Sequence, residues 1–166
     1  MTTLFIAEKP SMARELARCL PPPQQRGNGF IRTGGGIVTW AYGHVLQQAE
    51  PQDYDGRYKT WRAEDLPIIP QTWKLLVSPA SKDQFRIICQ LIEQADTLVN
   101  AGDPDREGQL LIDEILDYIG NTKPVRRILL NALDEKSIHE SLADLRDNGD
   151  FRHLKESALA RSRADW

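Results

Sequence analysis

The sequence predicts an α/β domain with a mostly parallel central sheet and helices on both faces. Short apolar runs of β type alternate with amphipathic segments along much of the chain, a pattern typical of strands joined by crossover helices. The chain has 166 residues, enough for one core of ordinary size and hardly enough for two. With 40% hydrophobic and 27% charged residues, the composition indicates neither a disordered nor a fibrous protein.

The first expected element is a strand over residues 4–7, and it ends at two charged residues, Glu8 and Lys9. Between residues 12 and 20 apolar positions recur at helical spacing, and three consecutive prolines then end the helix. The chain is therefore expected to open with a strand, a charged loop and a helix. Because the loop follows the strand, Glu8 should lie at the carboxyl edge of the sheet.

A hairpin and a long irregular segment are expected next. Two β-type runs, residues 30–33 and 37–41, flank three glycines and predict a hairpin with a glycine turn. Residues 43–70 show no periodicity and contain several proline and glycine breakers; a loop of this length inside a domain usually carries function or covers something. A strand over residues 73–77 and a helix capped by Ser81 should follow.

The second half of the chain repeats the alternation of strand and helix. A strand over residues 97–100 leads into a charged loop, and a strongly apolar helix over residues 110–119 is closed by a glycine. A last strand is expected over residues 125–130, followed by a helix capped by Asp134. Residues 158–166 have a helical pattern without a stop signal, which predicts that the chain is a piece of a longer protein.

Charge and composition narrow the class of protein. The formal net charge is −3, which by itself argues against a nucleic-acid-binding protein. No apolar run approaches the roughly 20 residues of a membrane helix, and the start lacks a basic stretch ahead of an apolar one, so a cytoplasmic protein is expected. Cys19 and Cys89 lie in helical patterns without a second ligand nearby, which favours buried, reduced thiols over a metal site or a disulfide.

The most informative segment is Asp103-Pro104-Asp105-Arg106-Glu107-Gly108, between a buried strand and a helix. Asp103 and Asp105 point the same way, since side chains alternate along an extended segment. If the strands before Glu8 and Asp103 are neighbours, these carboxylates converge, with Glu107 within reach. Such a cluster needs a cation, and its oxygen donors suit Mg²⁺ completed by water and phosphate. The alternative is a polar loop with an acidic helix N-terminus.

The order of these motifs resembles a known family. A strand ending in glutamate and a later strand ending in Asp-x-Asp are similar to the Toprim domain of topoisomerases, primases and some nucleases. Narrower matches to bacterial DNA topoisomerases III, which are type IA enzymes, run in order along the whole chain. The matching segments are Phe5–Ser11, Val38–Trp40 leading into Gly43-His44, Trp61 with Asp65–Pro67, Ala101–Gln109 and Ala158–Trp166.

The resemblance implies an activity for the whole protein. Type IA enzymes cut one DNA strand through a tyrosine, pass another strand through the gap and reseal it without a nucleotide cofactor, which gives relaxation or decatenation. Residues 1–150 would form the Toprim domain, and residues 151–166 the first helix of the next domain. The family's nucleophile lies in a Tyr-x-Arg segment, which is absent from this sequence. The chain alone, expected to be a monomer, should not relax DNA.

The resemblance also assigns roles to single residues. Glu8 is implied as the general acid and base at the 3′-oxygen, and Lys9 as the positive charge on the scissile phosphate. Glu8, Asp103 and Asp105 are the implied Mg²⁺ ligands, and Glu107 supports them. DNA is the implied partner, together with the remaining domains of the same chain.

Four further residues are candidate DNA contacts. Trp61 follows a basic and aromatic stretch that suits stacking on single-stranded DNA, and packing of this tryptophan onto the core fits equally well. His44 matches the family's Gly-His segment, with an ordinary hydrogen-bonded histidine as the alternative. Arg161 and Arg163 lie on the final helix, where the resemblance implies phosphate contacts; alternatively, Arg161 pairs with Asp165.

Two other classes of protein fit the acidic motif. One is another Toprim enzyme, such as a primase or a nuclease, for which different flanking residues are expected. The other is a non-catalytic module that binds Mg²⁺ or DNA. The net charge does not separate them, because the four acidic site residues contribute −4 and the rest of the chain therefore sums to +1.

Overall fold

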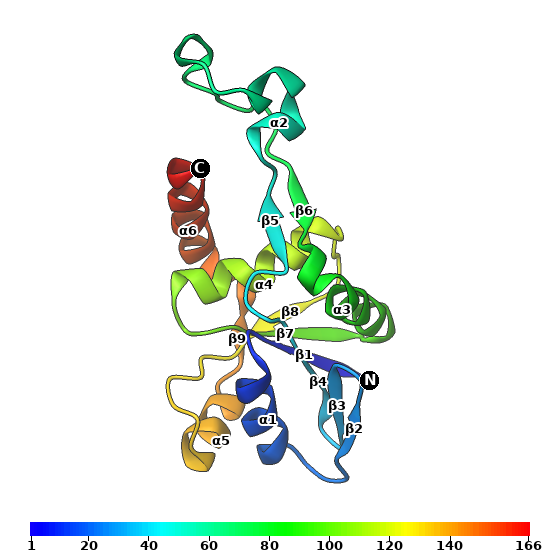
Figure 1. Cartoon of the computed structure of the whole chain (residues 1–166). Helices are drawn as coiled ribbons and strands as arrows, with labels where there is room; N and C mark the ends of the chain where they lie inside the picture. The colour runs from blue at the N-terminus through cyan, green and yellow to red at the C-terminus, as the bar shows by residue number, and fades with distance from the viewer.

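The computed structural model describes residues 1–166 and contains one seven-stranded sheet (Figure 1). Four central strands run parallel, and short antiparallel strands extend the sheet at both sides. In spatial order the strands are β2 (Gln25–Gly27), β3 (Phe30–Thr33), β4 (Gly36–Trp40), β1 (Thr3–Ala7), β7 (Thr97–Ala101), β8 (Val125–Arg127) and β9 (Arg146–Asp147).

Helices cover both faces of the sheet, which confirms the predicted fold class (Figure 1). Helices α1 (Pro10–Cys19) and α5 (Glu135–Ala143) lie on one face, and α3 (Lys82–Gln94) and α4 (Arg106–Tyr118) on the other. Helix α6 (Arg152–Asp165) packs against α4. None of the helices combines the length and the apolar character that a membrane span requires.

Strand β1 shows why the central strands are apolar throughout. Leu4 and Ile6 belong to the core beneath α3 and α4, whereas Phe5 and Ala7 belong to the core beneath α1 and α5. Successive side chains of a strand point to opposite faces, so a strand covered on both sides needs apolar residues at every position. The unbroken run that ends at Glu8 follows from this double burial.

The irregular segment forms a projecting arm, defined here as residues 46–77. Its base is a two-stranded sheet of β5 (Leu46–Gln48) and β6 (Leu75–Val77), and Figure 1 shows it extending far from the main sheet. The arm carries one short helix, α2 (Pro51–Tyr54), and two 3₁₀ turns, Gly56–Lys59 and Ala63–Asp65. The expected strand over residues 73–77 is therefore shorter than predicted.

Several boundaries differ from the prediction. Strands β2 and β9 were not expected, because both lie at sheet edges and their exposed polar residues give no apolar alternation. Strand β8 ends at Arg127 rather than at residue 130. Helix α4 begins at Arg106, so its first turn contains Glu107 of the acidic segment. Cys19 and Cys89 are half-buried rather than buried, and burial raises the pKa of both thiols.

Candidate functional site

The candidate site lies at the carboxyl edge of β1 and β7, which are parallel neighbours with Ala7 opposite Ala101. This register places Glu8 beside the loop after β7. The backbone N–H of Asp103 donates a hydrogen bond of 3.1 Å to a carboxylate oxygen of Glu8. This hydrogen bond therefore connects the two strand ends at which the sequence places acidic residues.

Lys9 lies between two of the predicted metal ligands. Its Nζ donates to Asp103 Oδ2 at 3.1 Å and lies 3.9 Å from Glu8 Oε1. The hydrogen bond to Asp103, followed by the negative charges of both carboxylates, raises the pKa of Lys9. The ammonium is about half exposed, so it remains accessible from solvent while it balances both acids.

Asp105 and Glu107 are held in a different way. Asp105 is the N-cap of α4, and its Oδ1 accepts a hydrogen bond of 2.7 Å from the Gly108 N–H. Glu107, in the first turn, lies 3.8 Å from the Arg106 guanidinium and lines a groove that also contains Arg161. The structure thus brings Glu8 and Asp103 together, whereas no three His, Cys, Asp or Glu side chains are gathered as a metal-binding group.

Two glycines allow a tight turn in the acidic loop, which is defined here as residues 102–105 between β7 and α4. A Cβ atom at Gly102 would overlap the carbonyl of Gly108, and a Cβ atom at Gly108 would overlap the backbone of Asp103. Both positions therefore require glycine, because the loop and the first turn of α4 touch through backbone atoms. This contact places the Asp103 and Asp105 carboxylates at the start of the helix.

A buried arginine that the sequence analysis did not single out lies beneath the loop. Arg127, at the end of β8, has 0% exposure. Its guanidinium donates to the carbonyls of Gly102 at 2.8 Å and Asp103 at 2.7 Å, and to Asn100. Burial lowers the pKa of Arg127 to about 10, which the nearby carboxylates partly oppose. The guanidinium stays charged at neutral pH and fixes the backbone of the acidic loop.

A buried polar network continues from this arginine into α4. Asp113 accepts hydrogen bonds from Asn100 at 3.2 Å, Gln109 at 2.8 Å and Asn148 at 2.8 Å. Asn100, Gln109 and Asp113 are all buried. The sequence offered one signal for this network. Asn100 is a polar residue in an otherwise apolar strand, and a buried polar residue needs hydrogen-bonding partners.

His44 lies near the same edge but contacts a different carboxylate. Its Nδ1 is 3.6 Å from Glu114 Oε2, and Glu114 is only 7% exposed. The neighbouring Glu114 carboxylate raises the pKa of His44, and the charges of Glu107 and Glu8 act in the same direction. The preceding Gly43 N–H donates to the Glu8 carbonyl at 3.3 Å, so His44 is placed beside the site through its backbone neighbour.

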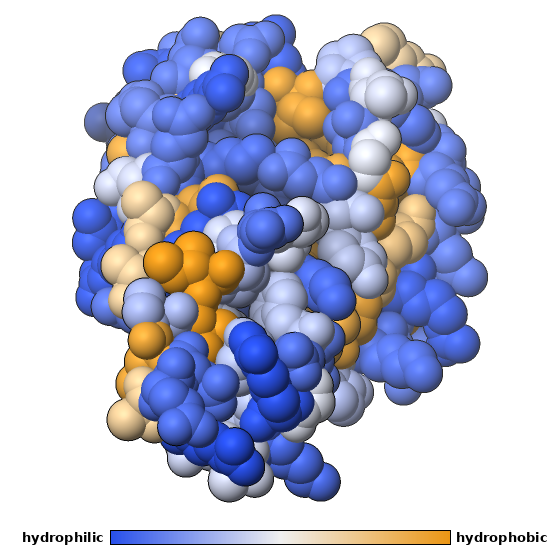
Figure 2. Space-filling view, turned by 90° about the horizontal axis from the view of Figure 1, so that it is seen from above, coloured by the Kyte–Doolittle hydropathy of each residue, from blue (hydrophilic) through white to orange (hydrophobic).

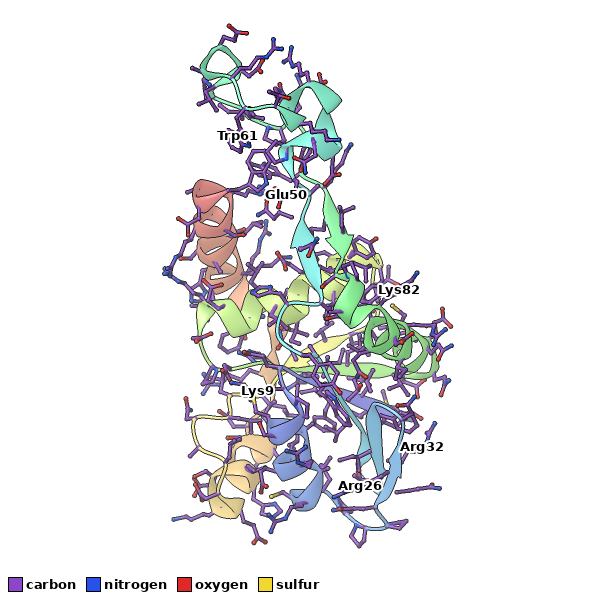
Figure 3. All side chains as sticks on the ribbon, in the orientation of Figure 1. Lys9, Arg26, Arg32, Glu50, Trp61 and Lys82 are labelled. Atoms are coloured by element: carbon purple, nitrogen blue, oxygen red, sulfur yellow. The ribbon has the colours of Figure 1, made fainter.

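The other predicted DNA contacts lie on the arm and on α6, where Arg161 shares a groove with Glu107. Trp61 is 73% exposed on the arm, far from Lys9 in Figure 3, so the alternative of packing onto the core is wrong. Arg161 pairs with Asp165 at 3.7 Å, which is the alternative that the sequence left open. The Arg163 guanidinium lies over the Trp73 ring, 5.2 Å from its centre.

The donor set fits a hard divalent cation. Glu8, Asp103 and Asp105 offer only carboxylate oxygens, the ligands that Mg²⁺ prefers. Glu8 and Asp103 already share one positive charge, the Lys9 ammonium, and the capping bond of Asp105 uses only one of its two oxygens. The residues therefore have the chemistry for a magnesium site, with Lys9 as the positive group beside it.

Comparisons with known proteins agree on one family. The model of the Toprim domain matches residues 3–133. Among curated proteins, the chain is 52% identical to DNA topoisomerase 3 of Haemophilus influenzae over 98% of this chain and 26% of that protein. It is 42% identical to DNA topoisomerase 3 of Staphylococcus aureus over 100% of this chain and 24% of that protein. The chain thus spans about a quarter of the length of these relatives.

The fold is also that of a solved structure. Full-length topoisomerase I from Thermotoga maritima matches with a TM-score of 0.55 and 15% sequence identity. The match covers 87% of this chain and 21% of that chain. At this identity the likeness concerns the fold alone.

Proposed function

This chain belongs to the Toprim family, and we propose that it serves as the metal-binding catalytic domain of a bacterial type IA DNA topoisomerase III. Near-complete coverage of this chain by relatives named DNA topoisomerase 3 supports this assignment over a primase or a nuclease. The observation that carries the proposal is the contact of Glu8, Lys9 and Asp103 at one edge of the sheet.

Lys9 is suited to the scissile phosphate. Its ammonium is exposed and already lies between the carboxylates of Glu8 and Asp103. A phosphodiester would approach here, at the carboxyl edge of β1 and β7, which we call the acidic edge. Negative charge develops on the phosphoryl oxygens during strand cleavage, and a fixed positive group lowers the energy of that state. Lys9 would exchange its bond to Asp103 for the phosphate.

Glu8 is suited to proton transfer at the 3′-oxygen. Its side chain is mostly buried and is oriented by the Asp103 N–H. The 3′-oxygen needs a proton when it leaves and must lose that proton when the strand is resealed. A carboxyl group held at the edge of the sheet can donate the proton and take it back.

Glu8, Asp103 and Asp105 would hold Mg²⁺, with Glu107 in support. When bound, Mg²⁺ supplies positive charge that offsets the phosphate and orients it. Arg127 would keep the loop carbonyls of Gly102 and Asp103 turned inward. The carboxylates of the loop would then face outward.

The nucleophilic tyrosine would come from outside this chain. None of the four tyrosines is hydrogen-bonded to Glu8, Lys9 or Asp103. Tyr54 packs on Trp166, Tyr58 accepts from Arg57, and Tyr118 packs on Phe85. Single-stranded DNA would reach the acidic edge along the groove lined by Glu107 and Arg161.

The metal assignment is tested by calorimetric titration with Mg²⁺. Asp105→Asn keeps an oxygen for the N-cap bond but removes the charge, so affinity should fall by at least about tenfold while the helix stays intact. Asp134→Asn is the matched control, because Asp134 caps α5 in the same way. The double variant Asp103→Ala, Asp105→Ala should lose measurable binding; unchanged affinity would refute the site.

A second assay concerns catalysis. The 166-residue chain should leave supercoiled DNA unrelaxed in the presence of Mg²⁺, because the nucleophile is missing. Relaxation by this chain alone would overturn the assignment of the tyrosine to another part of the protein.

A further inference from the structure

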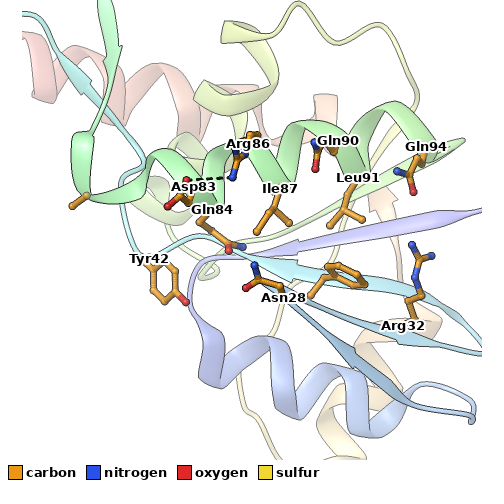
Figure 4. A pocket seen from close by; sticks show the side chains of 12 residues that line it. Asn28, Arg32, Tyr42, Asp83, Gln84, Arg86, Ile87, Gln90, Leu91 and Gln94 are labelled. Atoms are coloured by element: carbon orange, nitrogen blue, oxygen red, sulfur yellow. Dashed lines mark hydrogen bonds and ion pairs between the residues drawn. The ribbon is translucent and has the colours of Figure 1, made fainter.

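A second groove lies on the α3 side of the sheet, between α3 and the β2–β3 hairpin (Figure 4). Its volume is about 720 Å³. Helix α3 forms one wall, the hairpin the other, and Tyr42, just after β4, stands at one end. None of the residues assigned above to metal binding, catalysis or DNA contact lines this groove.

The groove is built around one buried amide. Gln84 is 6% exposed, and its Nε2 donates to the Gly29 carbonyl at 3.0 Å and the Trp40 carbonyl at 2.7 Å. Gly29 has φ +79°, and a Cβ atom there would overlap Gln84 Oε1. The helix and the hairpin are thus locked together at this point, while Oε1 accepts no hydrogen bond from the protein and is free for a donor on a ligand.

The floor of the groove offers flat and apolar surface. Phe30, Ile87 and Leu91 are among its lining residues. Tyr42 is 60% exposed at its end. Exposed aromatic rings that line a groove are platforms on which unpaired bases stack, and this stacking tolerates any base sequence.

Two arginines give the groove positive charge. The Arg32 guanidinium lies over the Phe30 ring, 5.2 Å from its centre, and Arg86 lies 3.4 Å from Asp83. Both guanidinium groups are exposed, and Asp83 is the one acidic residue in the lining. Arginine beside aromatic surface matches the alternation of phosphate and base along a single strand. The amides of Asn28, Gln90 and Gln94 add donors and acceptors for base edges.

The groove opens toward the acidic edge. Tyr42 directly precedes Gly43, whose N–H donates to the Glu8 carbonyl. From Asp83 to Gln94 the wall follows α3 for about 16 Å. Helices α6 and α3 lie on the same face of the sheet, with α6 at the left and α3 at the right of Figure 1. A strand that crosses the acidic edge from α6 would therefore continue past Tyr42 into this groove.

We propose that the groove between α3 and the β2–β3 hairpin binds a single-stranded DNA segment that flanks the cleavage site on the side away from α6. Tyr42 stacks on a base, Arg32 and Arg86 bind phosphates, and Gln84 Oε1 accepts from a base N–H group, such as N3–H of thymine. This inference rests on the proposed function, since it assumes that DNA reaches the acidic edge. None of the DNA contacts proposed in the groove requires Mg²⁺.

The test is a titration of the ¹⁵N-labelled chain with a short oligothymidylate in EDTA, followed by NMR. Amide shifts are expected on α3 and on residues 28–32. The double variant Arg32→Gln, Arg86→Gln should weaken binding at these resonances on the order of tenfold and lower the salt slope by about 1.4, since each phosphate contact contributes about 0.7. Tyr42→Ala should weaken binding on the order of tenfold through lost stacking.

Arg26→Gln is the matched control. Arg26 lies on the same hairpin but pairs in register with Ile31, whose side chain belongs to the core on the α1 face. Its side chain therefore points to the other face, and the variant should bind like the parent. Folding of each variant is checked by the dispersion of its amide spectrum.

The outcomes separate this inference from the proposed function. Asp103→Ala, Asp105→Ala should abolish Mg²⁺ binding and leave oligothymidylate binding in the groove unchanged. Shifts confined to α6 and the arm, or equal affinity of the parent and the arginine variant, would overturn the groove proposal while the metal site stands. Selective binding of an acidic peptide in place of the oligonucleotide would also overturn it.

Discussion

The acidic edge and the arm are built by opposite means. Beneath the acidic loop, Arg127 and Asn100 are buried and hydrogen-bonded to one another. Arg127 donates to the loop carbonyls, and the Asn100 side-chain oxygen accepts from the Gly102 N–H. The arm consists of short elements with exposed apolar side chains, among them Trp61 and Ile69. Figure 2, a view from above, shows a mostly hydrophilic surface with separate hydrophobic patches.

This difference separates two ways of placing a functional side chain. A buried polar network fixes the backbone of the loop through several hydrogen bonds at once, so the loop carboxylates have few alternative conformations. The arm has few buried contacts and is tied to α6 mainly through Trp166, which packs on Tyr54 and Trp73 and donates to the Ala49 carbonyl at 2.8 Å. We therefore expect catalysis at the rigid acidic edge, and binding contacts that can change their conformation on the arm.

The largest effect should come from Arg127→Met. This change leaves several buried carbonyls without a donor and removes the charge that faces Asp113, so it should cost about 3–5 kcal/mol of unfolding free energy, measured by urea denaturation. Arg126→Met is the control, because its exposed guanidinium reaches only the carbonyls of Leu145 and Arg146. Equal losses in the two variants would show that the network does not stabilise the edge.

Trp166→Ala should have an intermediate effect that is confined to the arm. Two edge-to-face pairs are lost, each worth about 0.5–1.5 kcal/mol, so hydrogen exchange of the arm amides should accelerate while that of β1 and β7 stays constant. Trp166→Phe keeps an aromatic ring and loses only the bond to Ala49, so it should show about 1 kcal/mol or less. Uniform acceleration along the whole chain would contradict the division into two regions.

His44 provides a smaller effect that depends on pH. Its pKa should lie above the ordinary value of about 6.5, and Glu114→Gln should lower it, as followed by NMR titration. Because the folded-state pKa is raised, the pair stabilises the fold fully below about pH 6.5, and this contribution is lost as the pH rises through the raised pKa. An unchanged titration midpoint in the variant would exclude Glu114 as the cause.

Trp61→Ala should change stability least. The ring is largely exposed, so the unfolding free energy should stay within about 0.5 kcal/mol, whereas affinity for single-stranded DNA should fall on the order of tenfold. Ile69→Ala is the control, since Ile69 is as exposed but has no ring to stack on a base. An equal loss of affinity in both variants would point to a general apolar effect.

Much of the acidic edge could be predicted from the sequence. Glu8 and Asp103 each follow an apolar strand, and parallel strands bring their carboxyl ends to one edge. The prediction needed one condition, that the two strands be neighbours, and the pairing of β1 with β7 meets it. The separate orientation of Glu107 was not predictable, because it depends on the groove that α6 forms beside α4.

Long-range contacts decided the remaining features. Gln109 and Asp113 are polar residues on a helix that the sequence predicts to be strongly apolar, and both are buried because α4 is covered by the sheet on one side and by α6 on the other. Arg127 follows another arginine in the sequence, and nothing in this local pattern distinguishes the two; the pairing of β8 with β7 turns Arg127 inward.

The sequence by itself determined the alternation of strands and helices and the acidic residues at two strand ends, because periodicity and charge placement are local properties. Only the tertiary structure decided which charges are buried, how Lys9 bridges Glu8 and Asp103, and where the groove beside α3 lies. These features depend on contacts between residues up to 95 positions apart, and no local pattern encodes such distances.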